Sequence, residues 1–284
     1  MEFVTLNNGL SMPIIGLGTW ALPNENLIQI VKKAYGIGYT KFDTAWKYKN
    51  ESVLGEAFQE LDCDRKNLFI TTKLHELQLY YGGRFKRFHI RKSSVVKAVK
   101  EALKNLKIDY LDLYLIHWPF PGYVNMYEDM VECYKEGLVK SIGVSSFTEI
   151  QLDEIYKKTK VMPAVNQFEI SPYNTRKDLI KACNDRNIII EAYSQFGGKW
   201  IASSELMNNP VLVKIAINYN KSVAQIILRW LLQQGVCVIP RSQNEARQSE
   251  NIDVFDFVLS NDDMKHIDNL NRESYVWGKP GDVD

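Results

Sequence analysis

The sequence is poor in cysteine, with four residues (Cys63, Cys133, Cys183 and Cys237) among 284, no CxxC pair and no histidine at metal-ligand spacing. These gaps argue against a disulfide scaffold and a structural zinc site, and they favour a reducing compartment. No stretch approaches the ~18 consecutive apolar residues of a membrane span. The first ten residues lack the basic start and apolar run of a secretory signal. We therefore expect a cytoplasmic protein that has no membrane partner.

An excess of charge of either sign is also missing, since 35 Lys and Arg balance 34 Asp and Glu, for a net charge of +1. This balance gives no general reason to expect a nucleic-acid partner. One segment, 84–92, is basic with interleaved aromatics, which suggests a nucleic-acid patch. In a neutral chain without a recognised binding module, a solvated loop leading into a helix capped by Ser93 or Ser94 is the favoured interpretation.

What the sequence does contain is a regular alternation of short apolar segments and longer segments of helical periodicity. The expected strands are 14–18, 41–43, 69–73, 111–117, 141–145, 164–169, 188–192 and 236–240. The expected helices are 25–36, 52–60, 94–106, 127–136, 149–158, 176–186 and 222–234. Eight such repeats without a dividing linker predict one α/β domain over residues 1–284, a (β/α)8 TIM barrel. A doubly wound sheet stays open from periodicity alone.

The amino terminus adds an expected N-terminal β-hairpin. Segments 3–6 and 10–12 flank Asn7-Asn8-Gly9, which we interpret as a two-residue Asn-Gly turn. This hairpin could cover the bottom of the barrel.

The segment 16–21 reads GLGTWA and matches the dinucleotide fingerprint GxGxxA after a strand. That function requires a helix that starts at the second glycine. Pro23 and Asn24 follow almost at once, so we expect the helix to start near Glu25. A tight strand exit with Trp20 at its lip is the favoured interpretation. The remaining histidines His75, His89 and His266 are expected on the surface or in loops.

Polar residues follow consecutive expected strands, at the end of a barrel where enzymes place their chemistry. Asp43 ends one strand, Tyr48 lies five residues later, and Lys73 and His117 end the next two strands. No serine or cysteine elbow and no metal cluster accompanies them. A phenol with a pKa of about 10 is too weak an acid to protonate a carbonyl readily at neutral pH, but an adjacent ammonium lowers that pKa.

We therefore expect Asp43 to hold Lys73 charged, Lys73 to lower the pKa of Tyr48, and His117 to hydrogen-bond a carbonyl oxygen. This set has no electron source, so a hydride cofactor has to supply the electrons.

Segments 43–51, 111–119, 143–147, 166–167 and 239–251 together resemble the signatures of the aldo-keto reductase family, in the family's order. The likeness is greatest to its smaller microbial members, of the diketogluconate and methylglyoxal reductase kind. The resemblance implies a metal-free NADP(H)-dependent barrel enzyme in which Tyr48 is the general acid, Asp43 and Lys73 tune it, and His117 orients the substrate.

The resemblance also implies a set of cofactor-binding residues. Ser145, Ser146 and Gln167 would hold the nicotinamide carboxamide and Tyr193 would stack on its ring. Arg241, Ser242 and Arg247 offer donors that suit a 2′-phosphate, with ordinary surface arginines as the alternative. The other implied cofactor positions are Thr19, Trp20, Asp43, Glu250 and Asn251.

Three positions depart from the family. Ser146 stands where Asn is usual, Arg241 where Lys is frequent, and Ser171 where His is frequent. The segment after Lys73 is longer than usual. The tail after Asn251 is short, so we expect the wall that closes the substrate pocket to be partial. Trp20, Trp46, His117 and Trp118 are expected to line an apolar substrate pocket; for Tyr123 and Trp277, pocket lining and simple packing stay equally open.

These expectations combine into a monomeric enzyme that reduces aldehydes and ketones, including small dicarbonyls, with NADPH. Two other functions stay open. One is a Schiff-base lyase with Lys73 as nucleophile, and the other is a non-catalytic NADPH-sensing module on the same barrel.

Overall fold

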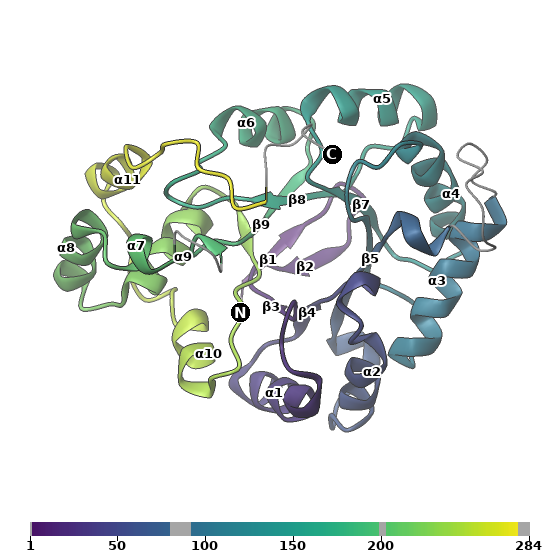
Figure 1. Ribbon diagram of the computed structural model, residues 1–284, viewed down its shortest axis with the longest axis horizontal. Coiled ribbons are helices and arrows are strands. Elements are labelled where there is room, and N and C mark those ends of the chain that lie inside the picture. Colours follow the sequence, from purple (N-terminus) through teal and green to yellow (C-terminus); the bar gives the residue numbers. More distant parts are fainter. Residues whose placement is uncertain (1, 80–91, 199–202, 278–284) are drawn as a thin grey trace.

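The computed structural model of the chain describes residues 2–79, 92–198 and 203–277 (Figure 1). Nearly all of the basic segment 84–92, with His89, lies outside these described residues. Among them, no helix is both long and apolar enough to cross a bilayer.

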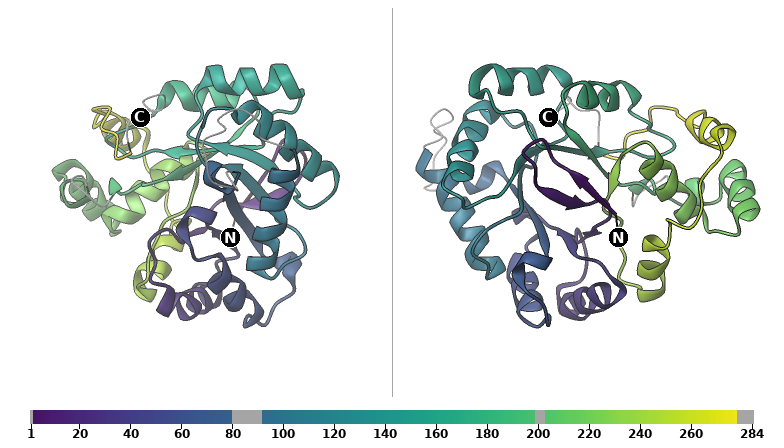
Figure 2. Two further views of the ribbon diagram at one scale, coloured as in Figure 1. Left: turned by 45° about the vertical axis from the view of Figure 1, so that its right-hand side comes forward. Right: turned by 180° about the vertical axis from the view of Figure 1, so that it is seen from behind.

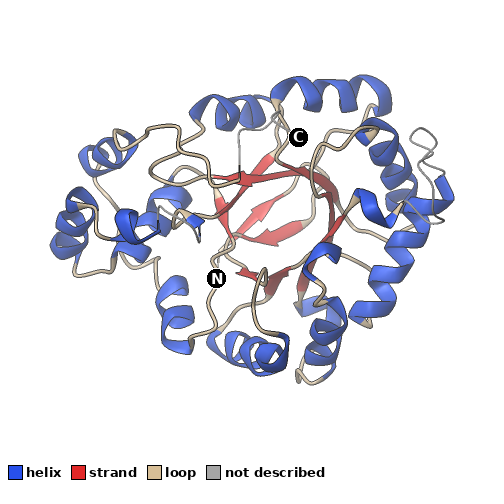
Figure 3. Ribbon diagram, viewed as in Figure 1, coloured by secondary structure: helices blue, strands red, loops and turns tan. Residues whose placement is uncertain are grey.

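Eight parallel strands form one sheet in which sequence neighbours pair (Figure 3). They are β3 Leu17–Gly18, β4 Lys41–Asp43, β5 Phe69–Leu74, β6 Leu113–Ile116, β7 Ile142–Ser145, β8 Val165–Glu169, β9 Ile189–Tyr193 and β10 Cys237–Val238. The first and last strands meet, because Ile15 bridges Val238 and the amide of Gly16 donates to the carbonyl of Val238 at 2.9 Å. The predicted barrel and all of its predicted strands are confirmed, with shifts of a few residues at their ends.

The helices lie outside the sheet (Figure 3). They are α1 Asn24–Ile37, α2 Glu51–Gln59, α3 Lys92–Leu106, α4 Tyr123–Lys135, α5 Glu149–Thr159, α6 Lys177–Asp185, α7 Ser203–Met207, α8 Pro210–Tyr219, α9 Val223–Gln233, α10 Glu245–Ile252 and α11 Asn261–Asp268. The helical stripe Val95, Val99, Ala102 and Leu106 of α3 is buried, as its spacing predicts. Because α3 begins at Lys92, the expected cap at Ser93 or Ser94 is wrong. Helices α7, α8, α10 and α11 were not predicted.

The amino-terminal hairpin pairs β1 Phe3–Thr5 with β2 Ser11–Pro13 and lies across the far end of the barrel (Figure 2, right). Its turn is not the expected two-residue one. The amide of Leu6 donates to the carbonyl of Leu10 at 2.9 Å, which leaves the three residues Asn7, Asn8 and Gly9 in the loop. Gly9 has φ +85°, and a glycine in this left-handed region is typical of three-residue hairpin loops.

An apolar cluster joins the hairpin to the strands. Its buried members are Leu6, Met12, Phe69, Leu113, Leu115, Ala164, Val165 and Cys237. The far end of the barrel is therefore packed, which leaves the carboxyl ends of the strands to form the site.

The fingerprint at 16–21 is a tight strand exit. Helix α1 begins at Asn24 rather than at Gly18, so its first turn lies beyond the fingerprint segment. A Cβ atom on Gly18 would lie 2.7 Å from the carbonyl oxygen of Ile239, so this glycine serves close strand packing.

Candidate active site

Asp43, Lys73 and Tyr48 form one hydrogen-bonded group at the carboxyl end of the barrel. Nζ of Lys73, on β5, lies 2.6 Å from Oδ1 of Asp43, the last residue of β4. The same ammonium donates to the carbonyl of Thr44 at 2.9 Å and to the hydroxyl of Tyr48 at 3.4 Å. Tyr48 ends a single 3-10 turn, Trp46–Tyr48, directly after β4. The strand ends and this turn bring the predicted residues together.

The electrostatics of this group differ from the expectation in one respect. Burial raises the pKa of Tyr48 above its ordinary value, and the nearby charge of Lys73 offsets only part of that rise. The net lowering that we predicted is therefore wrong, because desolvation of the phenolate outweighs the ammonium. Burial acts to lower the pKa of Lys73, but Asp43 and Tyr48 outweigh it and the pKa stands above the ordinary lysine value. At neutral pH, Tyr48 keeps its proton and Lys73 is an ammonium.

His117 follows β6 and lies beside Tyr48, with the two ring centroids 5.7 Å apart. Burial, reinforced by Lys73, holds the pKa of His117 well below its ordinary value, so the imidazole is neutral. Its Nδ1 atom is buried and has no hydrogen-bond partner within the described part of the chain.

His75 is a site residue that the sequence interpretation placed in a loop or on the surface. It is buried, and its ring lies 5.8 Å from that of His117 and 4.9 Å from that of Phe120. The ring of Trp46 lies 5.8 Å away on another side, with the ammonium of Lys49 stacked 3.1 Å from the Trp46 centroid. His75 lies in the loop between β5 and the turn Glu76–Gln78, as expected, but it is buried and not at the surface. His266 is exposed, as expected.

Gln167, on β8, joins the Asp43–Lys73–Tyr48 group to a second buried pair. Its Nε2 atom donates to Oδ2 of Asp43 at 2.8 Å and to Oε2 of Glu191 at 2.6 Å. Glu191 is in turn paired with the ammonium of Lys41. Both N–H groups of Gln167 are thus engaged inside the barrel, so only its carbonyl oxygen is left to contact a carboxamide.

Ser146 and Tyr193, two further predicted cofactor residues, share a hydrogen bond of 3.0 Å between their hydroxyl groups. Ser146 directly follows β7, and Tyr193 is the last residue of β9. Ser146 has φ +63° in the left-handed region, where Asn is the best tolerated residue that carries a side chain. The serine therefore keeps a backbone conformation that suits the asparagine usual in the family. Ser145 is buried at the end of β7.

Arg241, Ser242 and Arg247 lie around the start of α10. Asn244 caps this helix by accepting from the amide of Arg247 at 3.0 Å, and Ser242 accepts from the amide of Asn244 at 3.0 Å. Arg241 and Arg247 are exposed, and neither makes an ion pair with another described residue. Glu250 is half-buried and Asn251 is buried on the same helix. Two exposed guanidinium groups therefore lie at the start of α10 without a carboxylate partner among the described residues.

Thr19 and Trp20 connect this rim to the Asp43–Lys73–Tyr48 group. The hydroxyl of Thr19 donates to the carbonyl of Asp43 at 2.9 Å. The guanidinium of Arg241 lies 5.7 Å from the Trp20 ring centroid and donates to the carbonyl of Trp20 at 3.3 Å.

The tail after α11 reaches this end of the barrel. The amide of Val276 donates to both oxygens of Glu169 at 3.0 Å, and Nε1 of Trp277 donates to Oγ of Ser194 at 3.2 Å. Trp277 meets Trp20 edge to face with the centroids 5.1 Å apart. Both indoles are partly exposed, and together they form one aromatic wall at this end of the barrel.

Trp118 is half-buried against the main core. Tyr123 begins α4, where its hydroxyl bonds Glu154 of α5 and its ring meets Phe147 edge to face at 5.1 Å. Tyr123 therefore packs against α5 and the segment that follows β7.

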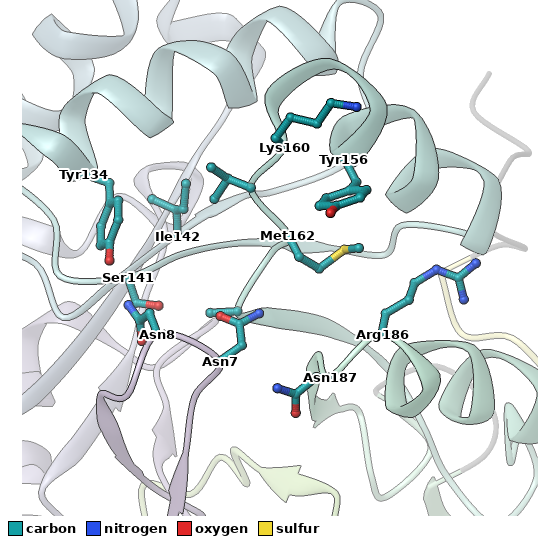
Figure 4. Close-up of a pocket in the computed structure, with 12 residues that line it drawn as sticks. Asn7, Asn8, Tyr134, Ser141, Ile142, Tyr156, Lys160, Met162, Arg186 and Asn187 are labelled. Carbon is teal, nitrogen blue, oxygen red and sulfur yellow. The ribbon is translucent and has the colours of Figure 1, made fainter.

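A separate pocket of about 350 Å³ lies at the opposite end of the barrel (Figure 4). Asn7 and Asn8 of the hairpin loop line it, together with residues that precede β7, β8 and β9, such as Ser141 and Asn187. None of the predicted site residues lines this pocket.

Lys41 and Glu191 are the interior residues that the sequence interpretation missed. A signal was present, because each lies two positions before a predicted site residue on the same strand, Asp43 and Tyr193. Alternate residues of a strand share one face, so both had to point into the barrel.

Comparison with known proteins gives consistent results. The sequence pattern described as the Aldo/keto reductase family matches residues 14–272. Glyoxal reductase of Bacillus subtilis (strain 168) is 40% identical over 284 residues, which cover 99% of this chain and 97% of the relative. Methylglyoxal reductase DkgA of Escherichia coli (strain K12) is 37% identical over 274 residues, 95% of this chain and 93% of the relative. The crystal structure of a Bombyx mori aldo-keto reductase in complex with NADP is similar with a TM-score of 0.88 and 33% identity, covering 97% and 94% of the two chains.

Proposed function

The chain belongs to the aldo/keto reductase family, and from that premise we propose that it reduces small aldehydes and ketones, including dicarbonyls, with Tyr48 as proton donor. It is an NADP-dependent oxidoreductase, as its reductase relatives and NADP-bound structural neighbours indicate. The observation that carries the proposal is the contact of Lys73 with both Asp43 and Tyr48 beside a neutral His117.

The residues at the rim fit NADP(H). Arg241 and Arg247 present exposed guanidinium groups at the start of α10, a combination that suits a phosphate. Tyr193 and Ser146 share a hydrogen bond at the carboxyl ends of β9 and β7, where they would hold the nicotinamide end with Ser145 and Gln167. We assign Ser242 to the same phosphate, and Glu250 and Asn251 of α10 to the adenine. When bound, NADPH supplies the hydride that reduces the carbonyl carbon.

The protein residues then have distinct tasks. Tyr48 holds its proton at neutral pH and donates it to the carbonyl oxygen as that oxygen gains negative charge. Lys73 stabilises the phenolate that remains, since its ammonium lies 3.4 Å from the hydroxyl oxygen. Asp43 keeps Lys73 charged and fixed at 2.6 Å. The imidazole of His117 is neutral, so it hydrogen-bonds the substrate oxygen without adding a second positive charge beside Lys73.

The same ion pair argues against a Schiff-base lyase. A lysine attacks a carbonyl only as the neutral amine. Lys73 is held by Asp43 and by the carbonyl of Thr44, and its pKa stands above the ordinary value. Lys73 therefore acts as a protonated ammonium beside Tyr48 and not as a nucleophile.

The aromatic side chains at the carboxyl end of the barrel and the names of two relatives support a substrate class. Trp20 and Trp277 form one aromatic wall, and Trp46 with His75 forms another. We propose that Trp20, Trp46, His117 and Trp118 contact the substrate. Two relatives are named glyoxal reductase and methylglyoxal reductase. A small dicarbonyl is the substrate we infer.

The test is the loss of reduced-nicotinamide absorbance with glyoxal, methylglyoxal, simple aldehydes and ketones. Turnover that is fastest with dicarbonyls supports the proposal. Binding of NADPH without turnover on the whole panel would indicate the sensor function, and an adduct at Lys73 trapped by borohydride would indicate the lyase.

We also propose that the chain acts as a single-domain monomer in the cytoplasm. One sheet takes its strands from Leu17 to Val238, and all four cysteines are free thiols, which is typical of a reducing compartment. Sedimentation of the full chain at micromolar concentration tests the monomer, which a dimer mass would contradict.

A further inference from the structure

A chain of charged and polar groups runs through the barrel interior from Lys41 to Tyr48. Lys41 pairs with Glu191, and Gln167 bridges Glu191 to Asp43 with bonds of 2.6 Å and 2.8 Å. Asp43 then holds Lys73, which contacts Tyr48. The pair Lys41–Glu191 lies outside the group that transfers the proton, yet it is connected to it by direct hydrogen bonds.

The Lys41–Glu191 pair is fully buried, with 0% exposure of both side chains. Barrel interiors are ordinarily filled by branched apolar residues, and a buried ion pair is often no more stable than an apolar pair of similar volume. The ammonium of Lys41 has one further acceptor, the carbonyl of Pro13 at 3.2 Å. Gly16 provides the space for its stem, because a Cβ there would lie 2.8 Å from Cγ of Lys41. A contribution to stability alone does not explain why Lys41 is buried as a charge that needs both an extra acceptor and the space left by Gly16.

The orientation of the Asp43 carboxylate depends on this connection. Its Oδ1 atom accepts from Lys73 and its Oδ2 atom accepts from Gln167, so both oxygens are held. Gln167 can present its amide nitrogen to Asp43 in this direction because its second N–H is held by Glu191. Without that acceptor, the amide has no fixed rotation and Oδ2 loses its donor.

We propose that Glu191, with Lys41 as its counter-ion, is a positioning residue for the reduction: through Gln167 it fixes the Asp43 carboxylate that holds Lys73 against Tyr48. This inference rests on the proposed function of Tyr48.

The charge of Glu191 gives the proposal a measurable signature. The ionisable groups that face Lys73 are Asp43 on β4, Tyr48 in the following turn, His117 after β6 and Glu191 on β9. Glu191 adds to the rise in pKa of both Asp43 and Lys73. A negative charge favours the protonated ammonium, so its removal makes proton loss from the coupled Lys73–Tyr48 pair easier.

The experiment compares two double variants, each of which removes both charges and so leaves no unpaired ion. Lys41→Met/Glu191→Met also removes the acceptor for Gln167, and we expect kcat to fall about tenfold while KM for the carbonyl stays within about twofold. Lys41→Met/Glu191→Gln keeps an amide oxygen as acceptor and should recover most of kcat. In both, the descending high-pH limb of kcat should move to lower pH, because Glu191 reaches Asp43 through Gln167 alone while Lys41 lies one contact further away, so the loss of the negative charge outweighs the loss of the positive one.

Thr71→Val on β5 is the matched control, a nearly isosteric change of a buried residue whose hydroxyl has no partner within the described residues. It should leave kcat and the pH profile unchanged. Wild-type kcat and an unmoved limb in both double variants would overturn the proposal. If the Met/Met variant does not fold, an unmoved limb in Lys41→Met/Glu191→Gln alone overturns it. Failure of the proposed function is distinct, since it would show as retained turnover in Tyr48→Phe.

Discussion

The ammonium of Lys73 contacts the hydroxyl of Tyr48 at 3.4 Å while the same nitrogen is held by Asp43 at 2.6 Å. The cation is therefore bound more closely to its counter-ion than to the phenol. Burial keeps Tyr48 protonated at rest, and the ammonium places a positive charge where the proposed proton transfer would leave a phenolate. The following predictions test the consequences.

Tyr48→Phe should lower turnover of the best carbonyl substrate by at least about a hundredfold, because the substitution removes the proton donor and leaves the ring. Stopped-flow or steady-state loss of NADPH absorbance measures the change. The dissociation constant for NADPH, measured by fluorescence titration, should stay near the wild-type value. Turnover within a few-fold of wild type would remove Tyr48 as the acid.

Lys73→Met should abolish most of the activity and also lower the free energy of unfolding by about 3 kcal/mol, because it leaves Asp43 as an uncompensated buried charge. Denaturant unfolding measures the second effect. The control is Asp43→Asn/Lys73→Met, which removes both charges and should recover stability without recovering turnover. Recovery of both would show that Lys73 acts only through folding.

Arg241→Ala should raise the dissociation constant for NADPH about tenfold or more, the loss expected for a charged hydrogen bond, and should change that for NADH little. Fluorescence titration with each cofactor measures the two constants. Arg186→Ala is the control, because Arg186 pairs with Glu149 and Asp153 on the outer helices. Equal losses for the two cofactors would refute a contact with the 2′-phosphate.

His75 should make the protein less stable at mildly acidic pH. Burial, with Lys47 and Lys49, lowers the pKa of His75 to about 4. As the pH falls from about 6.5 to about 4, the unfolded chain takes up a proton that the folded chain does not, so the free energy of unfolding decreases.

His75→Asn removes this titration and keeps an acceptor for the amide of Leu77, which His75 caps at 3.2 Å. The variant should lose less stability than the wild type over that window in urea unfolding. His266→Asn, at an exposed position, should follow the wild-type slope. Parallel slopes for His75→Asn and wild type would contradict the assignment.

Much of the barrel could be predicted from the sequence, because strand and helix periodicities are local. The strand Lys41–Asp43 was predicted to the residue, and the others to within a few residues. Helix α8, Pro210–Tyr219, was missed although Asn209 caps it and Pro210 starts it. The hairpin loop was predicted one residue too short, because its length depends on which residues pair across it and not on the Asn-Gly pair alone.

The grouping of Asp43, Lys73 and His117 at one end of the barrel was predictable, because each lies at or just after the end of a strand. The burial and protonation of these side chains were not predictable, because they depend on the folded environment. The pKa of Tyr48 is set by desolvation against a cation at a distance that only the fold provides. The burial of His75 was not predictable for the same reason, since its place in a loop does not show whether the ring is covered.

The buried Lys41 has a consequence for how this sequence can change over time. Gly16 cannot gain a side chain while the stem of Lys41 lies 2.8 Å from its would-be Cβ, and Lys41 cannot be lost alone without stranding Glu191. Gly16 directly precedes β3, Lys41 begins β4 and Glu191 lies on β9, so the three positions are far apart in the chain, yet they can be exchanged only in a restricted order. Descendants of this chain should therefore inherit Gly16, Lys41 and Glu191 as a unit.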